Sequence, residues 1–491
     1  MYRNLKRNLL IVFLLGVALF LRLYTIGNTA EFLGDQGRDG LAITASLEER
    51  KLFVTGPTVG AGYYTGPLYY YLMTPSYLLF PNSPIAPIIE MCIISVAAVA
   101  LFLSVASQLF GFRVAYIVSI LWAISPLMLL QDRRLWNPTP IPFFVLLLIA
   151  SLLWVFKQKK YWGYLTGALA VSVLLQLHYV NAISIVYIAL VWLLAEMNQM
   201  KQKQNKKRYV WMIGAVFLFV ASIGPFLWYE SQHAFFDIAG SMSTFIRGQD
   251  QVFSKRAYIA AVGKVIASLW KYVSASNSQI LLLGIAVFVL VVNGIRKVFV
   301  TRALVVWFCF GVSVLALYKD TMQPQYWYQL IPIVFLLFAA TLSHVHKKMI
   351  VVVSVLIVVV ASCISWTSIH PYKVEDPDLP RITQVTKKVS TLMQGRPFTF
   401  TVMHSRSFND MHIRYFFYLY GITPTSIDDP SNKTLIIICE NGCLEKPIEK
   451  TISIMCSTEV CPLDKPTVPF DVWHYEKTEK VGNSALYLYT R

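Results

Sequence analysis

Three charged side chains that could act together lie within residues 31–39, which read Glu-Phe-Leu-Gly-Asp-Gln-Gly-Arg-Asp. Asp35 and Asp39 are four residues apart, so a helix that begins at Gly34 would place both carboxylates on one face. Arg38 would lie close enough to bias their ionisation, because a neighbouring cation favours the charged form of an acid. The spacing indicates a candidate acid/base site, and the alternative is a solvated loop.

A second polar group occupies residues 131–138, between two apolar runs, and includes Arg133, Arg134 and Asn137. Guanidinium groups suit phosphate because their planar donor fork matches its oxygens. Two arginines on the outer side of a membrane depart from the usual charge asymmetry of loops. We therefore consider a phosphate site, with contacts to bulk lipid headgroups or a pair with Asp132 as the alternatives.

Further candidates lie at the ends of later apolar runs. His178 ends one run, and a lone histidine there is more often a hydrogen-bonded structural residue than a ligand. Lys319 adds a cation, and Gln325 and Tyr328 add hydrogen-bonding side chains on the same predicted side. None of these is specific alone, but their common location favours one outer site.

The composition requires that membrane helices position these residues. Hydrophobic residues make up 56% of the 491 positions and charged ones 14%, and the mean hydropathy is +0.55, which excludes a soluble globular protein. Residues 370–491 contain about fourteen basic and about fourteen acidic residues, so the net charge of +17 belongs to residues 1–369. The excess is explained by membrane topology and not by nucleic-acid binding.

Apolar runs near the bilayer-spanning length of roughly 20 residues predict about eleven transmembrane helices. They lie near residues 8–26, 84–110, 113–131, 138–156, 162–179, 181–199, 209–228, 278–294, 303–318, 325–343 and 350–368. If the spans alternate, every inner loop is basic and almost free of acids, which places the N-terminus in the cytoplasm of a multi-pass plasma-membrane protein. The odd number of spans places the tail outside.

The first external loop is predicted at residues 27–83. Its aromatic run, 67–80, contains Pro67 and Pro75 and is short for a full crossing, so we expect a helix in or re-entering the outer interface. Residues 229–277 form a second long external connection.

The tail, residues 370–491, alternates β-rich runs with a helical pattern at 409–420, which predicts a small extracytoplasmic α/β domain. Residues 1–369 form the membrane domain. Four cysteines gather in the tail: Cys439, Cys443, Cys456 and Cys461. They suggest two disulfides with three possible pairings, and a zinc site ranks second.

The layout of residues 1–369 resembles the GT-C class of membrane glycosyltransferases, and more narrowly the branch with protein O-mannosyltransferases, the lipid A aminoarabinose transferase and the RgtA/B/C/D-like enzymes. The segments that carry the resemblance are Gly34-Asp35-Gln36-Gly37-Arg38-Asp39, Gly66-Pro67-Leu68-Tyr69-Tyr70-Tyr71-Leu72, Ser125-Pro126 and Arg133-Arg134-Leu135-Trp136-Asn137-Pro138. Two departures from the class pattern are the replacement of His-Pro-Pro-Leu by residues 64–68, which begin with Tyr64, and Asn137 in place of an acid.

The resemblance implies transfer of a sugar from a polyprenyl-phosphate donor to a lipid, glycan or protein acceptor at the outer membrane face. It implies that Asp35 is the general base, since an acceptor hydroxyl must lose its proton as it attacks the anomeric carbon. Direct displacement would invert that centre. The arginines and Lys319 would stabilise the leaving phosphate, and we expect no cofactor or metal, because no compact ligand cluster is visible.

Three other functions stay open from the sequence. A transporter or flippase would bind the same lipid without breaking a bond. Such carriers commonly show internal repeats or charges deep within spans, and this sequence has no obvious repeat and no charged residues deep within most predicted spans. An oligosaccharide polymerase or ligase would use a diphosphate donor. A non-catalytic receptor would leave the Asp35 loop unexplained.

Overall fold

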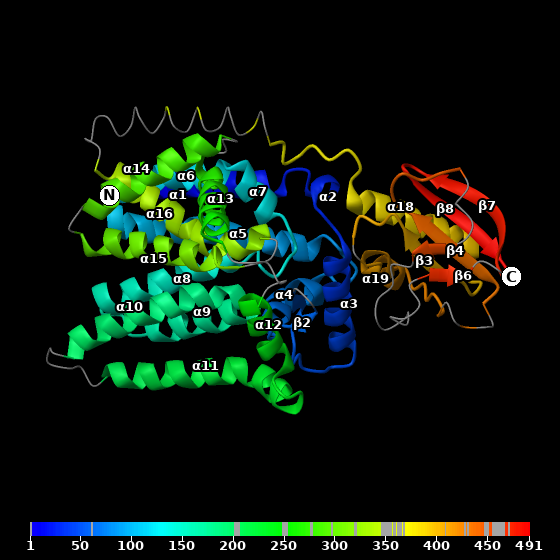
Figure 1. Cartoon of the computed structure of the whole chain (residues 1–491), viewed down its shortest axis with the longest axis horizontal. Coiled ribbons are helices and arrows are strands. Elements are labelled where there is room, and N and C mark those ends of the chain that lie inside the picture. Colours follow the sequence, from blue (N-terminus) through cyan, green and yellow to red (C-terminus); the bar gives the residue numbers. More distant parts are fainter. Residues whose placement is uncertain are drawn as a thin grey trace. The chain divides into compact units, whose positions relative to one another are not determined.

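Apolar helices make up most of the first 344 residues (Figure 1). The computed structural model describes residues 2–59, 62–200, 207–247, 254–274, 278–295, 298–318, 322–344, 356, 360, 366, 369–407, 409–426, 429, 432–445, 451–453, 467–469 and 472–491. The chain folds into two compact units. The helical unit comprises Met1–Tyr24, Leu52–Pro75 and Ile89–Pro371, and the C-terminal unit comprises Thr25–Lys51, Ser76–Ile88 and Tyr372–Arg491.

The helical unit contains the long apolar helices and a short β-hairpin. Its elements are α1 (Tyr2–Leu23), β1 (Thr58–Val59), β2 (Tyr63–Tyr64), α4 (Leu68–Leu79), α5 (Ala86–Phe110), α6 (Phe112–Ile124), α7 (Pro126–Asp132), α8 (Ile141–Leu152), the π-helix η1 (Leu153–Lys157), α9 (Gly163–Leu177), η2 (Tyr179–Asn181), α10 (Ala182–Met200), α11 (Lys207–Gln232), α12 (Phe236–Arg247), α13 (Lys255–Ser274), α14 (Gln279–Ile295), α15 (Phe299–Leu315), η3 (Pro324–Leu330) and α16 (Ile331–Leu342). The ends of α4 and α5 that face each other in sequence belong to the C-terminal unit.

Among the described residues, four helices are long and apolar enough to cross a membrane. They are Ala86–Phe110, Tyr179–Met197, Lys207–Gln232 and Pro324–Leu342, and α6 with α7 makes a fifth if this bent pair is one span. Four further apolar helices are shorter. A multi-helix membrane architecture is therefore confirmed, whereas the number of about eleven spans stays a prediction. The expected span at 350–368 falls largely outside the described residues.

Proline sets the start of several helices. Pro126 disfavours the helical conformation at Ser125, which is extended with ψ 120°, so α6 ends there and α7 continues at an angle of 65°. Pro142 and Pro332 lie in the first turns of α8 and α16, where a missing N–H costs nothing. Because of the bend at Ser125, α7 runs in a different direction from α6. Helix α7 leads into the arginine-containing segment.

Helix α13 was not expected, because residues 229–277 were predicted to be an external connection. One face of α13, with Val265, Leu269 and Trp270, is fully buried, and the helix packs against α14, α15 and α16. Its four basic residues lower the hydropathy on which the sequence prediction relied.

The C-terminal unit is built on a four-stranded sheet of order β3-β4-β8-β7 (Figure 1). Its elements are α2 (Ile26–Thr29), α3 (Gly34–Glu48), α18 (Asp378–Met393), β3 (Thr399–Met403), α19 (Met411–Leu419), β4 (Thr434–Cys439), β5 (Thr451–Ser453), β6 (Thr467–Pro469), β7 (His474–Val481) and β8 (Ser484–Thr490). Strand β3 is parallel to β4, while β4–β8 and β8–β7 are antiparallel. The predicted α/β character of the tail is visible in this sheet.

The central strand β4 is buried on both faces, as its run of Leu and Ile requires. Leu435 and Ile437 pack with Trp473 on one face, and α18 contacts β7 and β8. Cys439, at the end of β4, forms a disulfide with Cys443. The second predicted disulfide cannot be located, since Cys456 and Cys461 lie outside the described residues.

Helix α3, which carries the acidic group, packs against α19 of the same unit. The sequence predicts one boundary near residue 370, whereas the structure groups Thr25–Lys51 and Ser76–Ile88 with the tail. The first external loop is therefore divided between the units, and its acidic helix belongs to the C-terminal one.

Candidate active site

Helix α3 begins at Gly34 and brings the three charged residues together, as their spacing predicts. Arg38 Nη1 lies 2.8 Å from Asp35 Oδ1, and Arg38 Nη2 lies 2.8 Å from Asp39 Oδ1. The side chain of Asp35 is 21% exposed and that of Asp39 is 4% exposed. Asp35 is thus the carboxylate that a substrate can reach more easily, and Asp39 is placed to orient Arg38.

Two glycines on one face of α3, Gly37 and Gly40, allow it to lie directly on α19. A Cβ at Gly37 would collide with the backbone of Met411, and a Cβ at Gly40 would lie 2.7 Å from Tyr415 Cε2. Glycines three residues apart share one helix face, so this contact turns the polar residues between them away from α19. The spacing of Gly37 and Gly40 in the sequence is therefore a signal for close helix packing.

A cavity of about 260 Å³ lies within the helical unit, between α7, α13 and η3. Its lining comprises Leu127, Leu130, Gln131, Arg134, Ser268, Lys271, Tyr272, Pro324, Trp327 and Tyr328. Two predicted substrate contacts, Arg134 and Tyr328, therefore line the same cavity. Lys271 adds a second cation that was not predicted from the sequence. It lies in the last turn of α13, a helix that the sequence did not predict.

The Gln131 side chain adds hydrogen-bonding atoms to the cavity lining. The residue is 3% exposed, and neither atom of its amide group has a hydrogen-bond partner among the residues the structure describes. A buried polar group without a partner costs free energy, so native proteins rarely retain one. A bound anion would accept a hydrogen bond from the amide NH₂.

The neighbouring charged residues are used inside the protein. Asp132 pairs with the fully buried Arg22 of α1. Arg133, 3% exposed, donates to the carbonyls of Tyr24 and Pro371, at 3.0 Å each. These bonds anchor the end of α7 and leave Arg134 as the arginine that lines the cavity.

The other predicted contacts fall at several places in the helical unit. Asn137 Nδ2 donates to the Leu177 carbonyl at 2.5 Å, and His178 Nδ1 accepts from the Val180 amide at 3.3 Å. Both therefore have structural partners. Lys319 lies outside the described residues.

Tyr64 and Gln325 keep features of possible substrate contacts. Tyr64 is 39% exposed, and its amide donates to Asp237 Oδ1 at 2.9 Å, which ties the β-hairpin to α12. Gln325 Oε1 is buried without a hydrogen-bond partner in the described part of the chain. Within that part, no group of three or more His, Cys, Asp or Glu residues could hold a metal ion.

Comparison with solved structures shows what this fold is similar to. ArnT from Cupriavidus metallidurans bound to undecaprenyl phosphate matches with a TM-score of 0.61 and 10% identity, covering 87% of this chain and 92% of that chain. ArnT in the apo state matches with a TM-score of 0.59 and 11% identity, covering 88% and 92%. An oligosaccharyltransferase from Archaeoglobus fulgidus has a TM-score of 0.49 and 12% identity, covering 87% and 67%.

At the level of sequence, no protein-family model and no curated protein matches the chain. The likeness to ArnT, an aminoarabinose transferase, extends over nearly the whole of both chains and concerns the fold. The chain therefore shares the fold of ArnT, which agrees with the fold that the short motifs of the sequence predict.

Proposed function

We propose that the protein is a membrane glycosyltransferase that moves a sugar from a polyprenyl-phosphate donor to an acceptor hydroxyl at the outer membrane face. The observation that carries the proposal is the cavity where Arg134, Lys271 and the unpartnered Gln131 amide meet. Two cations and a buried donor suit a phosphate group. The fold likeness supports the same conclusion by analogy only.

The remaining lining of the cavity fits a lipid-linked phosphate better than a free nucleotide. Leu127, Leu130 and Pro324 give apolar surface beside the cations, as an isoprenoid chain attached to the phosphate requires. The volume of about 260 Å³ lies near the lower limit of ordinary small-molecule sites, which start at roughly 300 Å³. The cavity therefore suits a headgroup whose tail stays in the lipid.

In the proposed reaction Asp35 takes the proton of the acceptor hydroxyl, which attacks the anomeric carbon while the bond to the phosphate oxygen breaks. Direct displacement inverts that centre. Arg134 and Lys271 stabilise the charge on the departing lipid phosphate, and Asp39 orients Arg38. We assign Arg133 and Asn137 to structural roles because both bind backbone carbonyls. His178 also has a backbone partner, the Val180 amide, so the further proposed substrate contacts are Tyr64, Lys319, Gln325 and Tyr328.

We infer a multi-pass plasma-membrane topology with the N-terminus in the cytoplasm and the C-terminal unit outside. The Cys439–Cys443 disulfide supports this orientation, because disulfides persist mainly in extracytoplasmic compartments. The even charge balance of residues 370–491 agrees with it.

The proposal is tested by incubating the purified protein in liposomes with a panel of undecaprenyl-phosphate-linked single sugars and with candidate lipid, glycan and protein acceptors. Release of undecaprenyl phosphate together with labelled acceptor supports it. A parallel panel of undecaprenyl-diphosphate-linked sugars tests the alternative of a polymerase or ligase. Turnover of the diphosphate donors alone would replace the proposed donor class.

A further inference from the structure

The N-terminus of α3 is held by acceptors on two separate segments of the C-terminal unit. The Phe32 amide donates to Asp378 Oδ2 at 3.1 Å, and the Gly34 amide donates to Ser407 Oγ at 2.9 Å. The amide between them, that of Leu33, donates to Gln36 Oε1 within α3 itself. The three consecutive amides that precede Asp35 thus all have defined acceptors.

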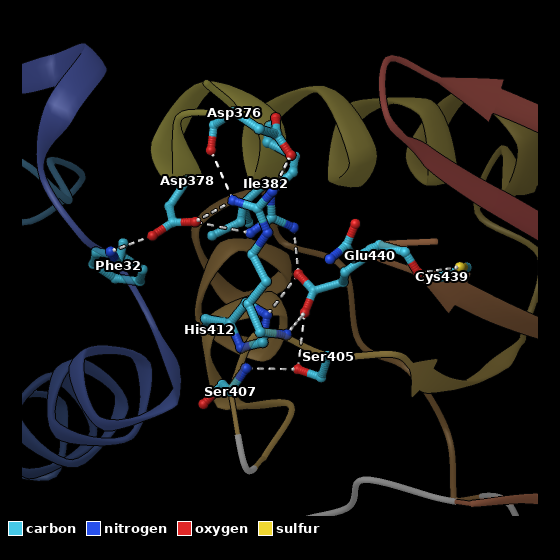
Figure 2. A network of polar contacts seen from close by, with 12 residues as sticks. Phe32, Asp376, Asp378, Ile382, Ser405, Ser407, His412, Cys439 and Glu440 are labelled. Atoms are coloured by element: carbon cyan, nitrogen blue, oxygen red, sulfur yellow. Dashed lines mark hydrogen bonds and ion pairs between the residues drawn. The ribbon is translucent and has the colours of Figure 1, made fainter. Parts of the chain in front are cut away.

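Both outside acceptors are connected to one buried carboxylate, that of Glu440 (Figure 2). Arg381 bridges Glu440 and Asp378, with Nη2 3.0 Å from Asp378 Oδ1. On the other branch, the Ser407 amide donates to Ser405 Oγ at 3.1 Å, and Ser405 Oγ donates to Glu440 Oε2 at 2.8 Å. We call these two branches, formed by Asp378, Arg381, Ser405, Ser407 and Glu440, the clamp. The clamp binds the backbone amides on both sides of Leu33.

Three members of the clamp, Glu440, Arg381 and Ser407, are shielded from water. Glu440 is fully buried, Arg381 is 5% exposed and Ser407 is 6% exposed. Buried hydrogen bonds between charged groups are stronger than exposed ones, and each member fixes the rotamer of the next. His412 Nε2, 3.0 Å from Glu440 Oε1, closes the network from α19.

We propose that Asp378, Arg381, Ser405, Ser407 and Glu440 form a positioning network that fixes Asp35 for catalysis. The inference rests on the proposed function, and it gives the C-terminal unit a role in turnover. None of these residues is a catalytic residue. They act through α3, because the anchored amides of Phe32 and Gly34 determine where the first turn of the helix, and hence the Asp35 carboxylate, lies.

The size of the expected effect follows from the geometry that proton transfer demands. A displacement of about 1 Å at a reacting group can cost about 100-fold in rate. Ser407→Ala removes the acceptor of the Gly34 amide without adding bulk. We therefore expect this variant to lower kcat about 10- to 100-fold while leaving the Kd for undecaprenyl phosphate unchanged.

Hydrogen exchange on the full-length protein tests the clamp without any activity assay. Peptides that cover residues 32–36 should exchange faster in Ser407→Ala and in Asp378→Ala, with partial rescue in Asp378→Asn, which keeps a carbonyl acceptor. The matched control is Lys388→Ala, which breaks the partly exposed pair with Glu479 on β7 in the same unit. Unchanged exchange in all the clamp variants, or an equal rise in the control, would overturn the proposed clamp.

A double-mutant cycle shows whether the clamp acts through Asp35. With an undecaprenyl-phosphate-linked sugar that the wild type turns over, Ser407→Ala should add no further loss in an Asp35→Asn background. If Ser407→Ala lowers turnover equally in the wild-type and Asp35→Asn backgrounds, the positioning role is refuted. Normal turnover by Ser407→Ala despite faster exchange would refute it as well. Neither result would affect the proposed function. Normal turnover by Asp35→Asn would instead refute the base assignment and the inference that depends on it.

Discussion

Asp35 and Asp39 of α3 have the same cation partner but different environments. Arg38 lies within salt-bridge distance of both. Only Asp35 keeps a substantial exposed fraction, 21% against 4% for Asp39. A base must reach the hydroxyl that it deprotonates, so the difference in exposure assigns the two roles.

Replacing Asp35 by Asn should lower turnover by roughly 10²–10⁴-fold, because the amide keeps the shape but cannot accept a proton. Asp39→Asn should cost less, since Arg38 retains Asp35. Lipid-phosphate release by both variants in liposomes, with Glu31→Gln as the control from the same segment, measures the effect. Near-normal turnover by Asp35→Asn would remove the assignment, and a larger loss in Asp39→Asn would exchange the two roles.

The cavity cations should contribute to donor binding separately. Arg134→Gln and Lys271→Gln each remove a charged donor, which is worth about 1.5–3 kcal/mol, or about 10- to 150-fold in the Kd for undecaprenyl phosphate. Lys264→Gln on the same helix is the matched control, because Lys264 is exposed and does not line the cavity. Equal Kd values for all three variants, measured in detergent micelles, would show that the phosphate binds elsewhere.

Among single residues, the charged group on α3 was easier to predict from the sequence than the lining of the cavity. The spacing of Asp35, Arg38 and Asp39 is a property of one helix, and the structure confirms that the three meet. Arg134 and Tyr328 were predicted on chemical grounds and line one cavity. Lys271 could not be predicted, because its position depends on how α13 packs.

Among the elements, α3 depends on glycine for its contact with α19. Gly37→Ala places a Cβ against the Met411 backbone, and overpacking of this kind costs about 1–3 kcal/mol. We expect faster hydrogen exchange in α3 and α19. The control, Gly263→Ala on α13, puts a Cβ into open space and should leave stability equal or slightly higher, since alanine favours helix. Unchanged exchange in α3 would mean that the helices do not pack this closely.

The buried carboxylate at the end of β4 should make the C-terminal unit sensitive to acid. Burial alone would raise the pKa of the Glu440 carboxyl, but the hydrogen bonds and charges of His412 and Arg381 outweigh it and hold the pKa well below its ordinary value. A lowered folded-state pKa stabilises the fold above the unfolded value of about 4.3, and this stabilisation is lost as the pH falls through the folded pKa.

Glu440→Gln should therefore destabilise the unit most at neutral pH, by about 3 kcal/mol, because it removes the fully buried partner of Arg381, which then keeps only Asp378 and Asp376. The difference from the wild type should shrink below about pH 4. Hydrogen exchange in α18 and β4, corrected for the intrinsic effect of pH on exchange, measures it. A difference that does not vary with pH would show that folding does not lower the pKa of the Glu440 carboxyl.

Elements with a strong pattern were predictable, and those set by packing were not. Apolar length located α8 and α16, and the β-rich runs of the tail indicated strands such as β4. The basic residues of α13 hid a helix whose other face carries Trp270. The association of α3 with the tail depends on contacts between segments more than 350 residues apart, which no local pattern reveals.

For the whole molecule, the charge distribution and the disulfide predict one orientation in the membrane. Val472→Cys places a thiol at a 51% exposed position of the C-terminal unit, and Lys160→Cys places one in a predicted cytoplasmic loop. An impermeant maleimide applied to intact cells should label the first and should reach the second only after permeabilisation, with the parent protein as the baseline. The reverse labelling pattern would invert the topology and place the disulfide in the cytoplasm.

The central claim, that the molecule breaks the bond between a sugar and a lipid phosphate, separates a transferase from a flippase that recognises the same lipid. Phosphorus NMR of liposomes that contain the purified protein, an acceptor and an undecaprenyl-phosphate-linked sugar measures this bond directly. We predict that the phosphodiester signal converts to the phosphomonoester signal with the wild type, and about 10²–10⁴-fold more slowly with Asp35→Asn. A phosphodiester signal that persists with the wild type for the whole donor panel, while the donor moves between leaflets, would contradict the account.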